Sequence, residues 1–117
     1  MSADGWERKR TVRLTTRGRK SGQPRTVTIW FVPAGPRGIF VQHVSRQPAQ
    51  WYSNLRRDPS VQLDFGSGAV DARARPIEEP DRVSDVLQMV RRKYWSAWLV
   101  QILGVGATPV AAEIAFD

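Results

Sequence analysis

The sequence predicts a mainly β domain of the α+β class, an antiparallel barrel carrying one short and one long helix. Three observations favour this fold. Short segments that alternate apolar and polar residues fill the first two-thirds of the chain. Turns rich in glycine and proline separate these segments closely enough for hairpins. Only two segments have helical spacing, too few for a series of parallel strands joined by helices.

The first three strands come from the alternating segments of the first third of the chain. Val12 and Leu14 alternate with polar neighbours in the first strand. In the segment 27–32, Val27, Ile29 and Phe31 alternate with Thr28, Trp30 and Val32, which predicts a strand that is apolar on both faces. Two prolines and two glycines at 33–38 predict a turn, and a third strand follows at 39–44.

A short helix is expected after the third strand. Pro48 suits its first turn, Trp51 and Leu55 share one face, and the Asp58-Pro59 pair ends it. The alternation then resumes in two strands between residues 61 and 76, joined as a hairpin by a Gly-Ser-Gly turn.

A long helix is expected from Asp81, with Pro80 in its first turn. Its apolar residues recur every three or four positions, and the spacing continues through the tryptophans up to Gly104: Val83, Val86, Leu87, Val90, Tyr94, Trp95, Trp98, Leu99 and Ile102. A closing strand with alternating apolar residues is expected at 110–116.

The 117 residues suit one domain, which we place at 11–117 after an N-terminal basic arm at 1–10. The chain has no cysteine and one histidine, so we expect no disulfide, no thiolate catalysis and no metal site. The first ten residues lack the apolar core of a signal peptide, and the stretch 94–105 is too short to cross a membrane. We therefore expect a cytoplasmic protein with no transmembrane segment.

The charge of the chain is concentrated in one segment. The formal net charge is +7, and the window from Glu7 to Arg25 holds eight basic residues against one acidic residue. The rest of the chain is therefore neutral in sum. A neutral body with one strongly positive segment indicates an anionic partner bound at a single place.

The centre of this window is a candidate anion-binding loop. Gly18 and Gly22 bracket Arg19-Lys20-Ser21, and Arg25 lies just beyond the turn. Glycines let a backbone approach an anion closely, while arginine, lysine and serine supply donors for phosphate oxygens. The alternative is an ordinary solvated basic turn, because short motifs of this kind often occur without function.

Two further segments join this loop in a recognisable order. The run at 14–25, LTTRGRKSGQPR, is followed by Trp51-Tyr52-Ser53-Asn54-Leu55 and then by Asp58-Pro59. Together they resemble the deazaflavin-dependent nitroreductase family, whose members are split β-barrel proteins that bind coenzyme F420, an 8-hydroxy-5-deazaflavin with a phosphate and a glutamate tail. The likeness covers roughly residues 13–76. The wider group of split barrels, of the flavin-reductase and pyridoxamine-phosphate-oxidase type, includes binders of flavin mononucleotide (FMN).

The resemblance implies a set of cofactor-binding residues. Basic and hydroxyl side chains of the loop and its flank would hold the phosphate and the acidic tail of the cofactor. Two residues of the second strand would line the deazaflavin ring, and the end of the third strand would contact the phosphate linker or the reacting edge. The short helix would support the site. These residues are, in that order, Arg19, Lys20, Ser21 and Arg25; Thr28 and Trp30; His43, Val44, Ser45 and Arg46; Trp51 and Asn54.

Several of these assignments have alternatives. Ser45 and Tyr94 are the candidate catalytic residues. Tyr94 is the nearest candidate by position for the tyrosines that position or protonate a substrate in some family members, although those tyrosines have no clear match here. His43 alternates with apolar residues and fits a hydrogen-bonded interior histidine as well as a donor to the cofactor. Trp51 fits a core residue better than a cofactor wall. The aromatic residues from 94 onward form either a lid or a plain buried helix face.

The resemblance implies an oxidoreductase that transfers a hydride from reduced F420 to a small conjugated acceptor, a quinone or a nitro compound. The alternatives are an FMN-dependent enzyme of the same fold and a non-catalytic cofactor carrier. A nucleic-acid partner is not expected, because Trp6 is the only aromatic residue in or beside the basic window. Split barrels often pair, so a homodimer is compatible with the sequence, as is the peripheral membrane contact made by family members with longer N-termini.

Overall fold

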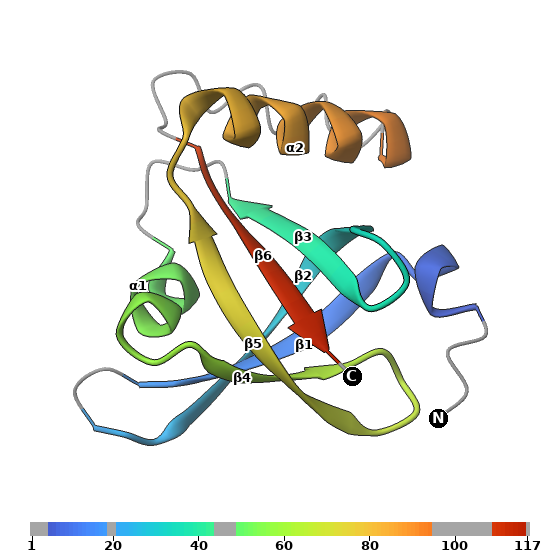
Figure 1. Ribbon diagram of the computed structural model, residues 1–117. Helices are drawn as coiled ribbons and strands as arrows, with labels where there is room; N and C mark the ends of the chain where they lie inside the picture. Colours follow the sequence, from blue (N-terminus) through green and yellow to red (C-terminus); the bar gives the residue numbers. More distant parts are fainter. Residues whose placement is uncertain (1–4, 19–20, 44–48, 95–108, 117) are drawn as a thin grey trace.

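The computed structural model describes residues 5–18, 21–43, 49–94 and 109–116. Six strands form a closed antiparallel barrel in the order β1-β2-β3-β6-β5-β4 (Figure 1). The strands are β1 Thr11–Arg17, β2 Pro24–Pro33, β3 Gly38–His43, β4 Ser60–Asp64, β5 Ala69–Ile77 and β6 Val110–Phe116; the helices are the 3-10 turn η1 Trp6–Arg8, α1 Gln50–Arg57 and α2 Pro80–Lys93. The predicted fold class is therefore confirmed.

The helix boundaries differ from those expected. α1 begins at Gln50 after the N-cap residue Ala49, so its start lies beyond Pro48. α2 ends at Lys93, and Tyr94 leaves the helical conformation with φ −125° and ψ 41°. The helical conformation expected at Tyr94 is therefore wrong, and the Tyr94 side chain bonds to the Phe31 carbonyl of β2. Residues 95–108, with the lid alternative, lie outside the described residues.

The interior of the barrel is filled by the alternating apolar residues, as period-two patterning requires. Leu14, Phe31, Val41, Leu63 and Ile114 are fully buried there. On one side α1 adds Trp51 and Leu55 to this core, so the core interpretation of Trp51 is confirmed (Figure 1).

An aromatic cluster closes another side of the barrel, where η1 lies away from α1 (Figure 1). The Trp6 side chain is only 6% exposed, and its ring centroid lies 5.1 Å from that of Phe65 and 5.3 Å from that of Phe116. The described part of the expected basic arm, residues 5–10, thus contributes a core residue to the domain instead of standing apart from it.

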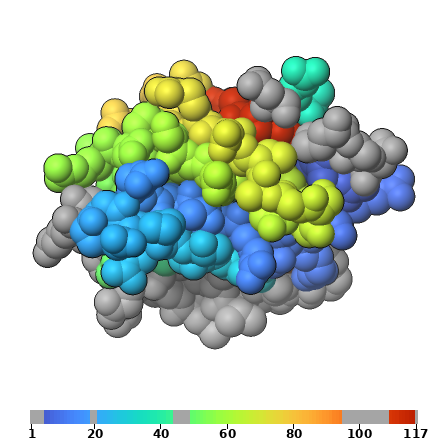
Figure 2. All heavy atoms as spheres, turned by 90° about the horizontal axis from the view of Figure 1, so that it is seen from below, coloured from blue at the N-terminus to red at the C-terminus, as the bar shows by residue number. Residues whose placement is uncertain are grey.

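α2 packs across β2, β3 and β6 and makes a second core layer with Val83, Val86 and Val90. This layer explains why β2 is apolar on both faces at its end. Phe31 belongs to the barrel core, whereas its neighbour Val32 is buried with the α2 residues. The opposite face of the molecule, formed by β1, β2, β4 and β5, is seen in Figure 2.

Candidate functional site

The seam between β2 and β3 is the place where the predicted site residues meet the barrel. β1 and β2 pair at seven positions, from Thr11↔Trp30 to Arg17↔Pro24. β2 and β3 pair at only three, ending at Phe31↔Val41. Within the described residues, positions 24–30 of β2 therefore have ladder partners in β1 alone. Among the described residues, the edge of β2 that faces away from β1 therefore has no ladder partner over positions 24–30, and we call it the open edge of β2.

Three of the predicted cofactor residues lie at this seam. Thr28 and Trp30 belong to the part of β2 that is not paired with β3. His43 is the last residue of β3, is half-buried, and pairs with Val110 of β6. The next predicted cofactor residues along the chain are Val44, Ser45 and Arg46, and these lie outside the described residues.

The seam residues occupy two faces of β2. Trp30 packs with the residues of the α2 layer, together with Val32. Val27 and Ile29 pack on the barrel core, and strand alternation places Arg25 on their side. The structure thus separates Arg25 from Thr28 and Trp30 by face. A ligand lying along the open edge of β2 would reach both faces, whereas one lying on either face would not.

The β1–β2 loop is held by its own backbone. The Gly18 N–H donates to the Gln23 carbonyl at 2.7 Å, and the Gly22 N–H donates to the Gly18 carbonyl at 2.8 Å. The Ser21 hydroxyl oxygen accepts a bond from the Gln23 N–H at 3.2 Å, which leaves its proton available as a donor. A Cβ at position 18 would lie 3.0 Å from the Ser21 Oγ and 3.2 Å from the Gln23 carbonyl oxygen, so a side chain there would force the loop to shift by a few tenths of an ångström. Arg19 and Lys20 lie outside the described residues.

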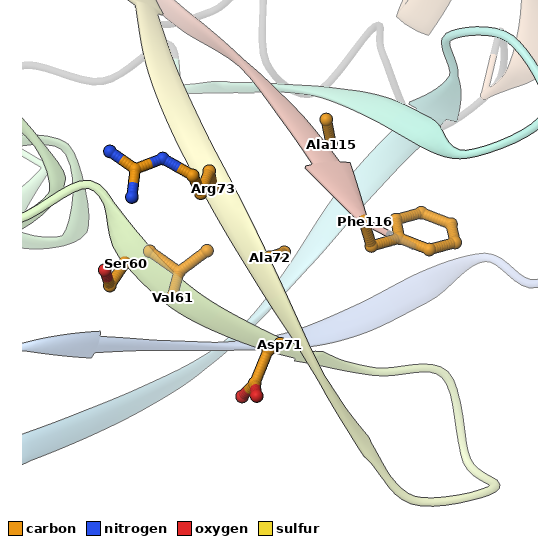
Figure 3. A pocket seen from close by; sticks show the side chains of 7 residues that line it. All are labelled: Ser60, Val61, Asp71, Ala72, Arg73, Ala115 and Phe116. Atoms are coloured by element: carbon orange, nitrogen blue, oxygen red, sulfur yellow. The ribbon is translucent and has the colours of Figure 1, made fainter.

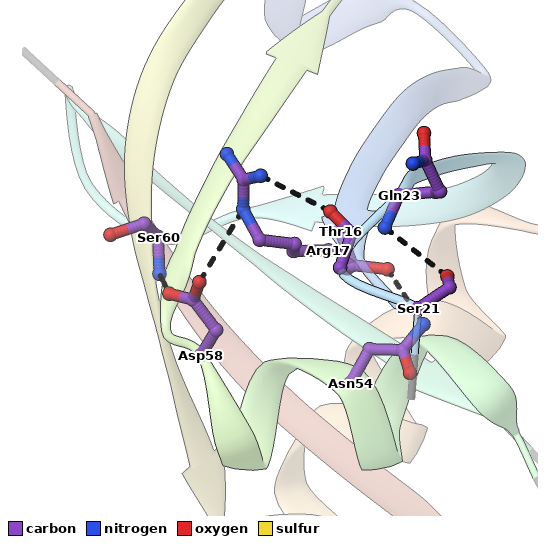
Figure 4. Close-up of polar contacts among 8 residues, drawn as sticks. Thr16, Arg17, Ser21, Gln23, Asn54, Asp58 and Ser60 are labelled. Atoms are coloured by element: carbon purple, nitrogen blue, oxygen red, sulfur yellow. Dashed lines mark hydrogen bonds and ion pairs between the residues drawn. The ribbon is translucent and has the colours of Figure 1, made fainter. Parts of the chain in front are cut away.

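Two described arginines flank this loop, and they differ in their partners. The Arg17 guanidinium donates to the Gly22 carbonyl at 3.1 Å and lies 3.7 Å from the Asp58 carboxylate (Figure 4). Arg25 is exposed, and the Cγ of its side chain is 3.8 Å from the position of a Cβ on Gly18. Arg17 therefore stabilises the loop, while Arg25 packs against it and keeps its charge toward solvent. No local sequence pattern predicts the Arg17–Asp58 pair, because its two residues lie 41 positions apart.

α1 is tied to the end of β1 by a buried polar contact. The Asn54 side-chain amide donates to the Thr16 hydroxyl at 3.1 Å, and both residues are buried (Figure 4). Just beyond the helix the Asp58 carboxylate accepts a bond from the Ser60 N–H at 3.0 Å. These contacts position the β1–β2 loop against α1, although the role predicted for Asn54 in cofactor binding stays a prediction.

Tyr94 is buried behind Trp30. Its side chain is 2% exposed, and its ring stacks on the Trp30 indole with centroids 4.6 Å apart and planes 8° from parallel. Its hydroxyl lies 2.8 Å from the Phe31 carbonyl and 2.5 Å from the Arg10 carbonyl, so its one proton is shared between two acceptors. Burial raises the pKa of Tyr94. This geometry gives Tyr94 a structural role and does not support the predicted role of a proton donor to substrate.

Lys93 also bonds to the Phe31 carbonyl, and the sequence analysis did not predict a role for this lysine. Its ammonium donates to the Phe31 carbonyl at 3.0 Å and lies 3.8 Å from the centre of the Phe31 ring. Burial and the nearby charge of Arg10 lower the pKa of Lys93 to about 8. The C-terminal end of α2 is therefore fixed to β2 where the β2–β3 ladder ends.

Two of the hollows in the described part of the structure are large enough for a small ligand and are lined by none of the predicted cofactor residues. A groove of about 550 Å³ crosses β4, β5 and β6 between Ser60, Arg73 and Phe116, and none of the predicted cofactor residues lines it (Figure 3). A second, mostly apolar pocket of about 520 Å³ lies between α1, α2 and the first residue of β6, Val110. No cluster of metal-ligating side chains occurs among the described residues, and none of the described helices is long and apolar enough to span a membrane.

Comparison with known proteins decides the family. The family model described as F420H(2)-dependent quinone reductase matches residues 3–108. The chain belongs to this family. The F420H(2)-dependent quinone reductases of Mycobacterium tuberculosis strains H37Rv and CDC 1551 are each 30% identical over 70 residues, which cover 58% of this chain and 47% of theirs. This quinone reductase family member thus spans about half the length of the curated relatives it matches.

Solved structures share the fold of this family member at lower identity. A domain-swapped dimer aligns with a TM-score of 0.73 at 20% identity, over 91% of this chain and 80% of that one. An F420-H2 dependent reductase aligns with 0.68 at 20% identity, over 91% and 94%. A Listeria innocua protein assigned as a pyridoxamine 5′-phosphate oxidase aligns with 0.65 at 13% identity, over 96% and 87%. These likenesses confirm the split β-barrel fold.

Proposed function

We propose that the chain is an F420-dependent oxidoreductase that transfers a hydride to a small conjugated acceptor, with a quinone as the first candidate. The observation that carries this proposal is the match to the F420H(2)-dependent quinone reductase family over residues 3–108, which includes the basic loop and the β2–β3 seam. The nitro compound expected from the first resemblance is a second acceptor to be tested. The activity of the longer curated relatives supports the proposal as an analogy.

The described residues fit an anionic and elongated cofactor. Ser21 and Arg25 offer a hydroxyl and an exposed guanidinium at one end of β2, and Thr28 and Trp30 lie toward its other end. At the rise of a β-strand, Arg25 and Trp30 are about 17 Å apart along the chain. A deazaflavin with a phosphate and a glutamate tail can span that length. The shorter FMN would leave part of the basic segment without a partner, which favours F420.

The chain's own contribution to such a reaction is binding and orientation. A bound reduced deazaflavin supplies the hydride. Arg19, Lys20, Ser21 and Arg25 would neutralise the phosphate and the acidic tail. Trp30, supported from behind by Tyr94, would orient the ring at the seam, and the packed α2 layer would keep water from one side of it. This mechanism needs no catalytic carboxylate pair and no metal.

Anaerobic oxidation of reduced F420 by a neutral naphthoquinone tests the proposal. We expect cofactor oxidation that depends on both protein and quinone, and a lower kcat for Trp30→Ala because the ring loses one wall. Met89→Ala, on the exposed side of α2, is the matched control and should retain wild-type activity. Oxidation of reduced FMN in preference to F420 would favour the flavin alternative, and the absence of turnover with bound F420 would favour a carrier.

A homodimer and a cytoplasmic location complete the proposal. The domain-swapped dimer among the structural neighbours is a property of that protein and supports a test on this one. Light scattering of the purified chain would give its mass in solution. A mass of 13.2 kDa would show a monomer, and twice that mass would support the dimer.

A further inference from the structure

The apolar pocket between α1 and α2 lies beside the proposed cofactor site. Val110 lines it, and Val110 is the ladder partner of His43, the last described residue of β3 at the seam. Residues paired across antiparallel strands project to the same side of the sheet. Val110 packs on the barrel core, and strand alternation places His43 on the same side as Ile39 and Val41. The pocket and the seam are therefore neighbours across a single pair of strands.

The pocket has the size and lining of a small-ligand site. Its volume of about 520 Å³ falls in the range of known ligand pockets. Tyr52 from α1, Val83 and Leu87 from α2, and Val110 supply an apolar wall. Ser84, which is exposed on the first turns of α2, lies at the same pocket and offers a hydroxyl.

The charge of the lining is opposite to that of the basic loop. Glu78 is the only lining residue in the described part of the chain that is charged at neutral pH. Its side chain is 70% exposed and lies 3.8 Å from the Arg56 guanidinium, which offsets part of its charge. An anion entering this pocket would lose hydration against apolar side chains and would meet a carboxylate at the rim.

We propose that this pocket holds the hydride acceptor, and that it admits uncharged ring compounds while disfavouring anionic ones. The proposal rests on the proposed function. The acceptor gains two electrons and two protons, as a hydride from the reduced deazaflavin and one proton from solvent, and a quinone leaves as its hydroquinone. The C–H bond of the reduced cofactor breaks, and the oxidised deazaflavin is the second product. The basic loop holds the anionic cofactor and the pocket excludes anions, so the two ligands do not compete.

Binding can be tested without turnover, using a redox-inert neutral naphthalene as the probe. We expect this probe to shift the NMR signals of the Val83 and Leu87 methyl groups, and Ser84→Trp to weaken that binding by about tenfold because the indole fills the pocket. Met89→Trp, on the same helix but outside the pocket, is the matched control and should bind the probe normally. Unchanged methyl signals in the wild type would overturn the proposal.

Charge selection is tested by comparing a neutral naphthoquinone with its sulfonate. We expect the wild type to have a kcat/KM about tenfold higher for the neutral compound, since an apolar pocket penalises the anion. Glu78→Gln should reduce this ratio by about twofold to threefold, and Glu79→Gln, its neighbour outside the pocket, should not. Equal kcat/KM values for both quinones in the wild type would contradict the selection.

The two proposals fail in distinguishable ways. If the wild type does not bind F420, the proposed function fails while the naphthalene titration still tests the pocket. If F420 binds with the same Kd in the wild type and in Ser84→Trp but KM for the neutral quinone is also unchanged, the acceptor lies elsewhere. A raised KM with an unchanged Kd for F420 supports the acceptor pocket.

Discussion

At the scale of single residues, the Phe31 carbonyl is the point where three parts of the chain join. It accepts bonds from Tyr94 and Lys93 at the end of α2, and the Tyr94 hydroxyl also reaches the Arg10 carbonyl just before β1. Buried backbone carbonyls need partners, and β2 leaves its ladder with β3 at this residue. Lys93 of α2 and Tyr94 just after it thus support β2 where its ladder with β3 ends.

Removing the Tyr94 hydroxyl should cost stability without removing the stack on Trp30. For Tyr94→Phe we expect the free energy of unfolding to fall by about 1–2 kcal/mol, because the buried Phe31 carbonyl and the part-buried Arg10 carbonyl lose the donor that they share. Urea denaturation measures this loss. Tyr52→Phe is the control, because Tyr52 is half-buried on α1 and outside this contact. Equal losses in both variants would show that the Tyr94 hydroxyl is not an anchor.

Lys93 should make stability depend on pH in the alkaline range. Its folded pKa is about 8, while the unfolded chain keeps the proton to about 10.5, so between these values the unfolded state binds more protons. The free energy of unfolding therefore rises with pH through this window. Lys93→Met should lack this rise, when urea titrations at about pH 7 and about pH 9.5 are compared. A constant difference between the two proteins would contradict the lowered pKa of Lys93.

At the scale of elements, η1 is part of the barrel although its sequence is polar. Trp6 is the single apolar residue of the described N-terminal segment that enters the aromatic cluster with Phe31, Phe65 and Phe116. A single tryptophan among charged residues forms no repeating apolar pattern, so the sequence predicted a separate basic arm at residues 1–10. The partners of Trp6 lie far along the chain, and only the folded barrel brings them to it.

Replacing Trp6 should therefore destabilise the whole domain. We expect Trp6→Ala to lower the free energy of unfolding by about 3–5 kcal/mol, the cost of emptying a large aromatic site in a core. Met89→Ala, at a side chain that is 39% exposed, should change it by less than about 0.5 kcal/mol. Thermal unfolding followed by circular dichroism compares the two. A small effect of Trp6→Ala would restore the picture of an independent arm.

The strands and helices were predictable because their signals are local. Alternation and turn residues located every strand, and the hairpin between β4 and β5 was expected from its Gly-Ser-Gly turn. The end of α2 was not predictable, because the helical spacing continues past Tyr94 while a long-range bond to Phe31 determines where that side chain goes. The shortened β2–β3 ladder was equally unpredictable, since the alternation of Val27, Ile29 and Phe31 runs without a break up to the residue where the ladder ends.

At the scale of the whole molecule, the charge pattern predicted one positive segment on a neutral body. The proposed site combines the basic loop, the open edge of β2 and the apolar pocket. The loop and the edge suit a long anionic cofactor, and the pocket suits an uncharged acceptor. The residues of the candidate site were predicted from the resemblance of the 14–25 motif to a known family, and their arrangement in space was not predicted. The resemblance implied cofactor contacts for both Arg25 and Trp30. The sequence did not show that they occupy opposite faces of β2, because the predicted strand began at Val27 and only the structure extends it back past Arg25.

The most direct test of this account is a fluorescence titration of the purified chain with F420, with FMN and an oligonucleotide in parallel. We expect F420 to bind with the lowest Kd of the three, and binding to be lost in the Arg19→Ala/Lys20→Ala double variant and weakened in Arg25→Ala. Arg57→Ala, an exposed arginine on α1, is the control for charge alone. Tighter binding of FMN, or F420 binding that survives the double variant, would contradict the central claim.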